Sequence, residues 1–344
     1  MNRRVGWALA AGLALSACAG LPDLAPRFQL VSPADLAVVD SLGPVPVSPA
    51  PAGTWWQDFA DPQLDALIDE ALTASPTLQM AQARVARARA VAGIAEGATR
   101  PALALAGEAD RERFSKNYLL PPSLGGGYWN TARLAGEFSY GLDFWGRHKS
   151  RWQGAQAELQ AARAEAQASR LMLASAISQV YGALDYQFLE ADLVARLATQ
   201  RQEALRLTDL RVKAGLEPES ARERAAAQLA AARGLQAAST ERIQGLRHQL
   251  AALLGAGPDR GLAIGRPALR PVGALTLPSR LPADLIGRRP DVAALRARVQ
   301  ASGKYVEAAR ADFYPDVNLV GFAGLQSLGL TDLFQAGSLQ LGVG

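Results

Sequence analysis

The chain has 344 residues and a formal net charge of +4; 49% of its residues are hydrophobic and 20% are charged. Basic and acidic side chains are interspersed instead of gathering into a basic face with interleaved aromatics, so nucleic-acid binding is disfavoured. Cys18 is the only cysteine in this sequence, which excludes an internal disulfide and a cysteine-based metal site.

The N-terminal segment 1–17 has the pattern of a signal peptide. Two arginines precede an apolar run, Val5–Ala17, that is too short to span a bilayer as a helix. The tetrad Leu15–Cys18 is similar to a bacterial lipobox, which implies cleavage before Cys18 and attachment of a diacylglycerol and an N-acyl chain to it. Ala19 replaces the aspartate that often retains lipoproteins at the inner membrane. We therefore expect a chain that is lipid-anchored in the cell outer membrane and extends into the periplasm.

Residues 18–53 are predicted to form an extended tether, because seven prolines in this segment exclude regular helix. Helices are then predicted over 61–97. Asp61-Pro62 supplies an N-cap followed by a proline at the first helical position, and Ser75-Pro76 repeats that signal for a second helix.

Residues 102–143 are predicted to form a β-hairpin. In its return strand, the charged residues Arg133 and Glu137 alternate with apolar or aromatic ones such as Leu134 and Phe138. An ordinary antiparallel sheet gives the same alternation, so the period of two does not by itself indicate a membrane sheet. Aromatic residues near the strand ends suit the interfacial girdles of a membrane sheet. An apolar-faced hairpin in lipid would leave open edges, so we expect other copies of the chain to complete it.

Residues 147–255 are predicted to form a long helical hairpin. No proline interrupts the first half, which could extend roughly 100 Å as a helix. Two adjacent apolar stripes at heptad spacing indicate packing partners on both sides, as in a ring of helices. Gly215 ends the first helix, Pro218 begins the next, and five prolines over 256–284 predict a second extended connector.

The sequence contains an internal duplication. Its markers, 214 positions apart with no gap between them, are Pro76 and Pro290, and Pro101 and Pro315. A period of this length indicates duplication of a whole structural unit instead of a solenoid. We interpret 54–255 as the first repeat and 285–344 as a partial second repeat, which lacks the second long helical hairpin.

No catalytic constellation and no metal-ligand spacing can be identified. The two histidines, His148 and His248, are predicted to lie on helices without clustered carboxylates. Gly125–Gly127 is a loop signal and not a phosphate cradle, because no Lys-Ser/Thr pair follows it. The sequence therefore predicts that the chain is not an enzyme and carries no cofactor apart from the lipid on Cys18.

Several stretches resemble the TolC-type outer-membrane efflux proteins, in particular the lipoprotein (NodT-type) branch that serves tripartite efflux systems. They are Trp55-Trp56 with Phe59, Asp61-Pro62 and Leu64; Ala71-Leu72 with Ser75-Pro76; the nine residues from Ser139 to Arg147; Leu277-Pro278 with Leu281; Arg288-Arg289-Pro290-Asp291; and Ala308-Ala309-Arg310 with Phe313-Tyr314-Pro315. The resemblance extends from Cys18 to Gly344.

This resemblance implies an α+β membrane protein: a TolC-like homotrimer with a shared twelve-stranded β-barrel, to which each chain gives about four strands. A long α-helical tunnel continues the barrel through the periplasm. A periplasmic adaptor, bound to an inner-membrane pump, docks at the helical tips. The matching tip residues are Arg211, Gly215, Leu216 and Ser220, and the candidates for lining the pore are Arg133 and Glu137.

The favoured function is a passive exit duct of a tripartite efflux pump, which carries drugs or other small molecules across the periplasm and outer membrane. A periplasmic lipoprotein adaptor or a structural coiled-coil protein is an alternative, disfavoured by the duplication and the aromatic-faced strands. A truncated channel without function is another. Because the second long hairpin is missing from this sequence, we expect that the chain alone does not form a sealed channel. A lipid-anchored hydrolase is disfavoured by the lack of catalytic residues.

Overall fold

The computed structural model describes residues 53–117, 123, 125–270 and 289–344. The predicted signal peptide, the lipidation site Cys18 and nearly all of the predicted tether lie outside these residues. Positions 271–288, where the predicted connector meets the second repeat, also lie outside them. The described chain divides into two compact units, a sheet unit and a helical unit.

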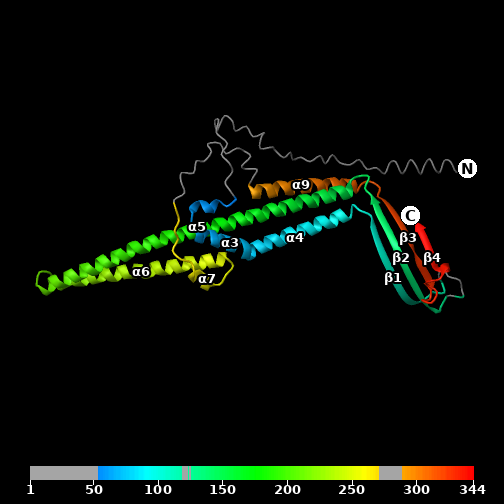
Figure 1. The fold of residues 1–344 in the computed structure, drawn as a ribbon. Helices are drawn as coiled ribbons and strands as arrows, with labels where there is room; N and C mark the ends of the chain where they lie inside the picture. Colours follow the sequence, from blue (N-terminus) through cyan, green and yellow to red (C-terminus); the bar gives the residue numbers. More distant parts are fainter. Residues whose placement is uncertain (1–52, 118–122, 124, 271–288) are drawn as a thin grey trace, which may run out of the picture. The chain divides into compact units, whose positions relative to one another are not determined.

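The sheet unit comprises the described residues of Ala86–Ala161 and Leu295–Gly344. Its strands form one antiparallel sheet in chain order (Figure 1). They are β1 (Ala102–Arg113), β2 (Tyr128–Leu142), β3 (Val317–Leu328) and β4 (Leu339–Val343). Since β2 of the first repeat pairs with β3 of the second, the sheet joins the two copies of the duplicated unit.

The pairing register gives the sheet two chemically different faces. Directly opposed residues share a face, and successive residues along a strand project from opposite faces. The side called here the apolar face carries Leu103, Leu105, Leu134, Phe138, Tyr140, Leu142, Leu319, Leu325, Leu339, Leu341 and Val343. The side called the polar face carries Glu108, Asp110, Glu112, Thr131, Arg133, Glu137, Ser139, Gln326 and Gln340, together with Val320, Phe322 and Leu328.

Three helices adjoin the sheet. α4 (Pro76–Gly97) leads into β1, α9 (Pro290–Ala311) leads into β3, and α5 (Arg147–Lys213) follows β2. α9 packs closely on the first turns of α5: a Cβ added to Gly154 would lie 2.6 Å from a ring carbon of Tyr305, so this crossing requires glycine. α4 and α9 have the same length, 22 residues, as two copies of one unit should.

The helical unit contains the remainder of α5, a helix of 67 residues, and α6 (Glu219–Leu253). These two helices run side by side as a hairpin (Figure 1). The shorter elements η2 (Trp55–Phe59) and α3 (Pro62–Ala74) pack at its base. In the described ranges, none of the helices combines the length and the apolarity that a membrane crossing requires.

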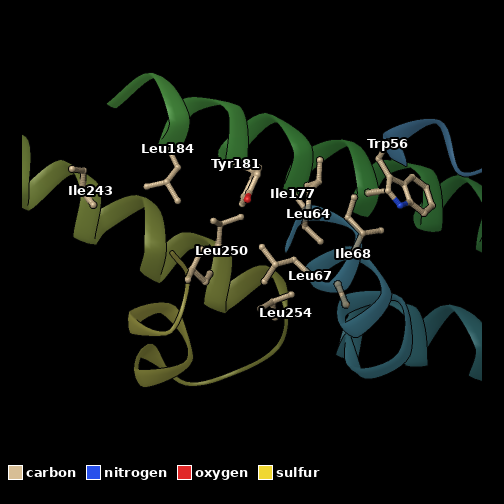
Figure 2. Packing of buried hydrophobic residues seen from close by; sticks show 13 residues of the cluster. Trp56, Leu64, Leu67, Ile68, Ile177, Tyr181, Leu184, Ile243, Leu250 and Leu254 are labelled. Carbon is tan, nitrogen blue, oxygen red and sulfur yellow. The ribbon is translucent and has the colours of Figure 1, made fainter. Parts of the chain in front are cut away.

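The core of the helical unit forms where η2 and α3 meet the hairpin (Figure 2). Leu64 of α3, Tyr181 of α5 and Leu250 of α6 are among its fully buried side chains. The buried hydroxyl of Tyr181 donates to Asp61 Oδ2 at 2.8 Å and accepts from Gln63 Nε2 at 2.7 Å. A satisfied polar network inside an apolar core favours one packing arrangement over others.

Residues 256–270 correct the prediction that the whole connector is extended. They form the short helix α7 (Pro258–Leu262), and Ile264 is buried in the core. The backbone N–H of Ala268 donates to Asp61 Oδ2 at 2.7 Å. Proline restricts long helices here, but it does not prevent packing, because a buried side chain and a carboxylate acceptor hold the segment in place.

Candidate functional site

The apolar face of the sheet is exposed in the single chain. Leu103, Leu105 and Leu341 are 81%, 78% and 67% exposed, respectively. Burying apolar surface is worth about 25 cal/mol per Å², so water-soluble sheets normally cover such a face with a second layer. A contiguous exposed apolar surface on a folded sheet therefore indicates contact with lipid or with another protein.

The sheet also ends in two edges that are unpaired within the described chain. β1 and β4 are the outermost strands, and each has a neighbour on one side only. Unpaired backbone N–H and C=O groups find no partners in lipid. A sheet with an apolar face and two open edges must therefore be completed by strands from elsewhere before it can lie in a membrane.

The polar face carries both residues predicted to line a pore. Arg133 and Glu137 are four residues apart on β2, so they project from the same face. Arg133 Nη2 donates to Glu137 Oε1 at 2.8 Å, and the two side chains are 33% and 43% exposed. Their role in lining a pore stays a prediction.

Three carboxylates on the polar face were not among the predicted site residues. Glu108, Asp110 and Glu112 are alternate residues of β1 and are all exposed. They line a hollow of about 570 Å³ together with Thr131 and Arg133 of β2. The period of two that revealed β2 also applies to β1 and would have identified them. The polar face is thus the hollowed side of the sheet and is predominantly acidic at this end.

An aromatic contact joins the two repeats where the strands meet the helices. The ring of Trp145 stacks on Tyr314, with centroids 4.4 Å apart and 16° between the ring planes. Trp145 Nε1 donates to the carbonyl oxygen of Pro315 at 3.1 Å. Phe144 and Phe313 are 69% and 64% exposed beside this pair. The junction therefore presents four aromatic side chains close to the end of the apolar face.

Arg147 forms the ionic part of the same junction. Its Nη2 donates to Asp316 Oδ2 at 2.7 Å, and its Nη1 lies 3.6 Å from Asp312 Oδ1. Arg151 Nη2 lies 3.1 Å from Asp312 Oδ2. The hydrogen bond between Arg147 and Asp316 raises the pKa of the guanidinium and lowers the pKa of the carboxyl group. Both partners are therefore charged at neutral pH and tie the segment between α9 and β3 to the start of α5.

The four predicted tip residues lie together at the turn between α5 and α6. Gly215 has φ +72°, a left-handed conformation that favours glycine. The backbone N–H of Leu216 donates to the carbonyl of Arg211, and that of Gly215 donates to Val212, both at 2.9 Å. These two bonds define a Schellman helix end. Ser220 follows in the first turn of α6.

Leu216 is unusual for this kind of helix end. The residue after the left-handed glycine commonly packs back onto the preceding turn. Leu216 is instead 75% exposed. Polar contacts surround it: Arg211 Nη1 lies 3.1 Å from Glu217 Oε1, and Arg224 Nη1 donates to Ser220 Oγ at 3.5 Å. An exposed leucine with an ion pair and a side-chain hydrogen bond close to it in sequence is suited to contact with a partner, and adaptor binding stays a prediction.

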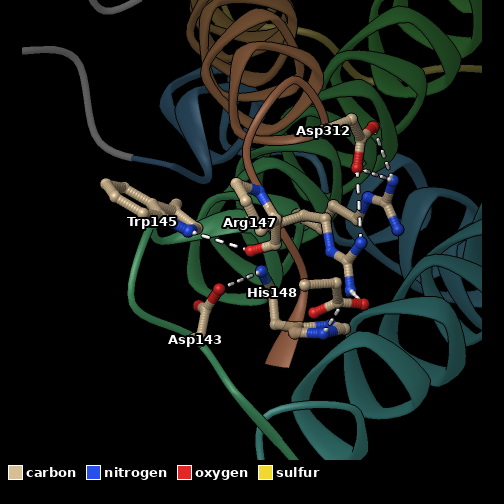
Figure 3. A network of polar contacts seen from close by, with 8 residues as sticks. Asp143, Trp145, Arg147, His148 and Asp312 are labelled. Carbon is tan, nitrogen blue, oxygen red and sulfur yellow. Dashed lines mark hydrogen bonds and ion pairs between the residues drawn. The ribbon is translucent and has the colours of Figure 1, made fainter. Parts of the chain in front are cut away.

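The described residues contain no group of three or more His, Cys, Asp or Glu side chains that could hold a metal ion. His148 lies at the sheet–helix junction, where its Nε2 is 3.1 Å from Arg147 Nη2 and its backbone N–H donates to Asp143 Oδ1 at 3.1 Å (Figure 3). This arrangement caps a helix and does not pair a base with a nucleophile.

A family model described as "Outer membrane efflux protein" matches residues 67–256 and 281–344. The multidrug resistance outer membrane protein MdtP of Escherichia coli (strain K12) is 34% identical over 339 residues, which cover 95% of this chain and 68% of MdtP. The fusaric acid resistance protein FusA of Burkholderia cepacia is 32% identical over 319 residues, which cover 92% of this chain and 60% of FusA.

The fold is similar to a solved structure as well. The crystal structure of the outer membrane protein VceC from Vibrio cholerae superposes with a TM-score of 0.77 and 34% sequence identity. The match covers 86% of this chain and 70% of VceC. Sequence and fold therefore agree on the same group of proteins.

Proposed function

We propose, because the chain belongs to the outer membrane efflux protein family, that it supplies one protomer's share of the wall of a passive exit duct. The resemblance to TolC-type outer-membrane efflux proteins is confirmed by the family match and by the similarity to VceC. Efflux and an outer-membrane location follow from the family. The assembly, its partners, its lipid anchor and its substrates belong to the proposal.

The two-faced sheet is the observation that carries the proposal. Its apolar face suits the lipid side of a barrel wall, and its hollowed, charged face suits a water-filled lumen. β2 has 15 residues, and a tilted membrane strand needs about 9–11. β1, β2 and β3, with 12, 15 and 12 residues, are thus long enough to cross a membrane, and the sheet is chemically divided as a barrel wall requires.

The aromatic junction fits the periplasmic boundary of the membrane. Outer-membrane sheets carry aromatic side chains at both edges of their apolar band. Phe144, Trp145, Phe313 and Tyr314 lie just beyond the strand ends that lead into the helices. We assign this end to the periplasm, which places the β1–β2 and β3–β4 loops on the outside of the cell.

Completion of the sheet requires further copies, and we propose a homotrimer. Each chain would place the open edge of β1 against a strand of its neighbour, so that no edge is left in lipid. The exposed Leu193 and Tyr186 of α5, each 67% exposed, would be covered by helices of adjacent copies.

We propose that a periplasmic adaptor, bound to an inner-membrane pump, docks at the tip formed by Arg211, Gly215, Leu216 and Ser220. Support comes from the rigid Schellman turn and from the exposed Leu216. Transport energy would come from the pump, since the duct itself only encloses a path. A diacylglycerol and an N-acyl chain on Cys18 would anchor the chain in the outer membrane in addition to the sheet.

The names of MdtP and FusA indicate resistance to multiple drugs and to fusaric acid in those proteins. We propose drugs or other small organic molecules as the cargo here. A wide aqueous lumen selects weakly, so the choice of cargo would fall to the pump.

Site-directed fluorescence tests which face meets lipid. Leu319 and Val320 are neighbours on β3, 47% and 45% exposed, and they project from the apolar and the polar face, respectively. Leu319→Cys and Val320→Cys, each made in a Cys18→Ser chain and labelled with bimane, form a matched pair. We expect brominated phospholipid to quench the label at position 319, and aqueous iodide to quench the label at position 320.

Iodide quenching of both labels, or lipid quenching of both, would contradict the proposed membrane sheet.

Native mass spectrometry of the same protein checks the assembly, with a trimer expected. Leu216→Asp checks the tip: it should weaken adaptor binding while leaving trimer formation and bimane quenching unchanged.

A further inference from the structure

The outer end of β1 separates opposite charges by face. Asp110 and Glu112 project from the polar face, opposite Thr131 and Trp129 of β2. The residues between and after them, Arg111 and Arg113, project from the apolar face, opposite Asn130 and Tyr128. Both arginines are exposed. In this stretch of alternating acidic and basic residues, every acid is therefore on the lumen side of the proposed barrel and every base is on the lipid side.

The position of the arginines along the strand matters as much as their face. On β2, Leu142 marks the periplasmic end of the apolar face in the proposed orientation. Asn130, the partner of Arg111, lies twelve residues away toward the opposite end of the strand. That separation is about 41 Å along the strand and about 31 Å along the membrane normal at a tilt of about 40°. An outer-membrane apolar band is about 25 Å tall. Arg111 and Arg113 thus lie beyond the hydrocarbon, at the level of the outer headgroups.

The two guanidinium groups remain available in the described chain. Arg113 Nε donates to the carbonyl oxygen of Gly126 at 3.1 Å, which orients the side chain without neutralising it. Among the described residues, Arg111 and Arg113 form no ion pair, although Asp110 and Glu112 adjoin them in sequence. The carboxylates project from the other side of the sheet. Tyr128, 69% exposed, stands directly opposite Arg113 on the same face.

We propose that Arg111 and Arg113 bind the phosphate groups of an anionic glycolipid in the outer leaflet of the membrane. The inference rests on the proposed orientation of the sheet. Arginine matches phosphate because its planar donors bind two oxygens at once. An arginine on a lipid-facing strand is strongly disfavoured at the midplane but nearly neutral at the interface, where phosphate oxygens are available. Tyr128 adds the aromatic contact that favours the same depth.

Lipid A, which carries two phosphates, is the appropriate probe. Binding of fluorescent lipid A to the purified full chain in nonionic detergent can be followed by anisotropy. Arg111→Gln with Arg113→Gln should raise the Kd roughly 30-fold, since each basic residue near an anionic surface contributes about fivefold. Dephosphorylated lipid A should bind the original chain as weakly as intact lipid A binds this variant.

The matched control changes the interleaved acids. Asp110→Asn with Glu112→Gln alters the same stretch of β1 on the opposite face and should leave the Kd for lipid A unchanged or lower it. Arg111→Lys with Arg113→Lys keeps the charge but loses the contact with two oxygens at once, so it should restore part of the affinity, with a Kd between those of the original chain and the glutamine variant. This restoration distinguishes phosphate binding from a folding defect in the glutamine variant.

Equal affinity for intact and dephosphorylated lipid A would overturn the inference, as would an unchanged Kd in the glutamine variant. Inorganic phosphate is tested as a competitor: full displacement at equal phosphate concentration would mean that the arginines recognise free anions instead of the lipid. Lipid quenching of bimane at position 319 is measured on the same samples. If that quenching occurs without a preference for phosphate, only this inference fails; if it does not occur, the proposed function fails.

Discussion

Arg147 Nη2 donates to Asp316 Oδ2 at 2.7 Å, although 169 residues separate the two in the chain. Arg147 begins α5, directly after the strands of the first repeat, and Asp316 precedes β3 of the second repeat. The ion pair therefore holds the two copies of the duplicated unit together at the point where strands give way to helices. Trp145 and Tyr314 stack beside it.

This pair predicts a particular response to acid. The pKa of Asp316 is lowered by its hydrogen bond to Arg147, so the folded state holds the deprotonated carboxylate more firmly than the unfolded state does. The stabilisation is present above the unfolded pKa of about 4 and is lost as the pH falls through the lower, folded pKa. Asp316→Asn should lower the Tm at neutral pH and should lose this effect in strong acid.

Thermal unfolding of the sheet, followed by circular dichroism across this pH range, checks the expectation. Arg147→Gln removes the other partner and should show the same pH window. A destabilisation by Asp316→Asn that stays constant down to strong acid would contradict the role given to the ion pair.

Tyr181 predicts the opposite response, a loss of stability in alkali. Burial in the core raises the pKa of the Tyr181 phenol well above its ordinary value. The unfolded chain then loses its proton first, so the stability is complete below about pH 10 and falls as the pH rises above it. Tyr181→Phe should cost about 1 kcal/mol at neutral pH and should make the alkaline decline shallower.

Urea denaturation at neutral pH and above pH 10 measures this difference. Tyr186→Phe is the matched control, because Tyr186 lies on the same helix and is 67% exposed. If both variants decline with pH as the original chain does, the buried phenol is not the titrating group.

Buried and exposed leucines of α5 should differ sharply in their contribution to stability. Leu184 is 0% exposed within the core, and Leu193, nine residues later, is 67% exposed. Leu184→Ala should reduce the free energy of unfolding by about 2–5 kcal/mol, because it leaves a cavity. Leu193→Ala should change it by less than about 0.5 kcal/mol in the dissociated chain. Equal effects in dilute detergent solution would contradict the packing in Figure 2.

Gly215, in the turn after α5, and Gly182, inside α5, should respond in opposite directions to alanine. Gly215 has φ +72°, so Gly215→Ala places a side chain in a left-handed conformation and should cost about 1–2 kcal/mol. Gly182 lies within α5 with no atom within 4 Å of an added Cβ, so Gly182→Ala should add up to about 1 kcal/mol of stability. Urea unfolding measures both; stabilisation by Gly215→Ala would exclude the Schellman turn.

A charge on either side of β1 tests the assignment of its faces. Leu105 lies on the apolar face, and its partner Gly136 is six residues from Leu142, near the middle of the proposed apolar band; Ala104 lies on the polar face. Leu105→Arg should cost about 2–4 kcal/mol in the membrane, whereas Ala104→Arg should insert almost normally. The alkaline-resistant membrane fraction reports this difference. Normal insertion of Leu105→Arg would contradict a lipid-facing position.

Much of the local structure follows from the sequence alone. Asp61-Pro62 starts α3, and the Gly215 turn ends α5, because capping and backbone preferences depend on a few neighbouring residues. The alternation along β2 correctly placed Arg133 and Glu137 on the face opposite Leu134. The four tip residues lie at one turn because a helix end brings residues close in sequence close in space, and their contact with an adaptor stays a prediction.

The tertiary structure decided which distant segments meet. Pairing of β2 with β3, stacking of Trp145 on Tyr314 and burial of Ile264 each join residues that are far apart in the chain. The segregation of Arg111 from Asp110 acquired meaning only when the register showed which face each residue shares with Leu105. Periodicity and capping are set by interactions within about one helical turn or one strand pair, whereas long-range contacts depend on the complementarity of whole surfaces.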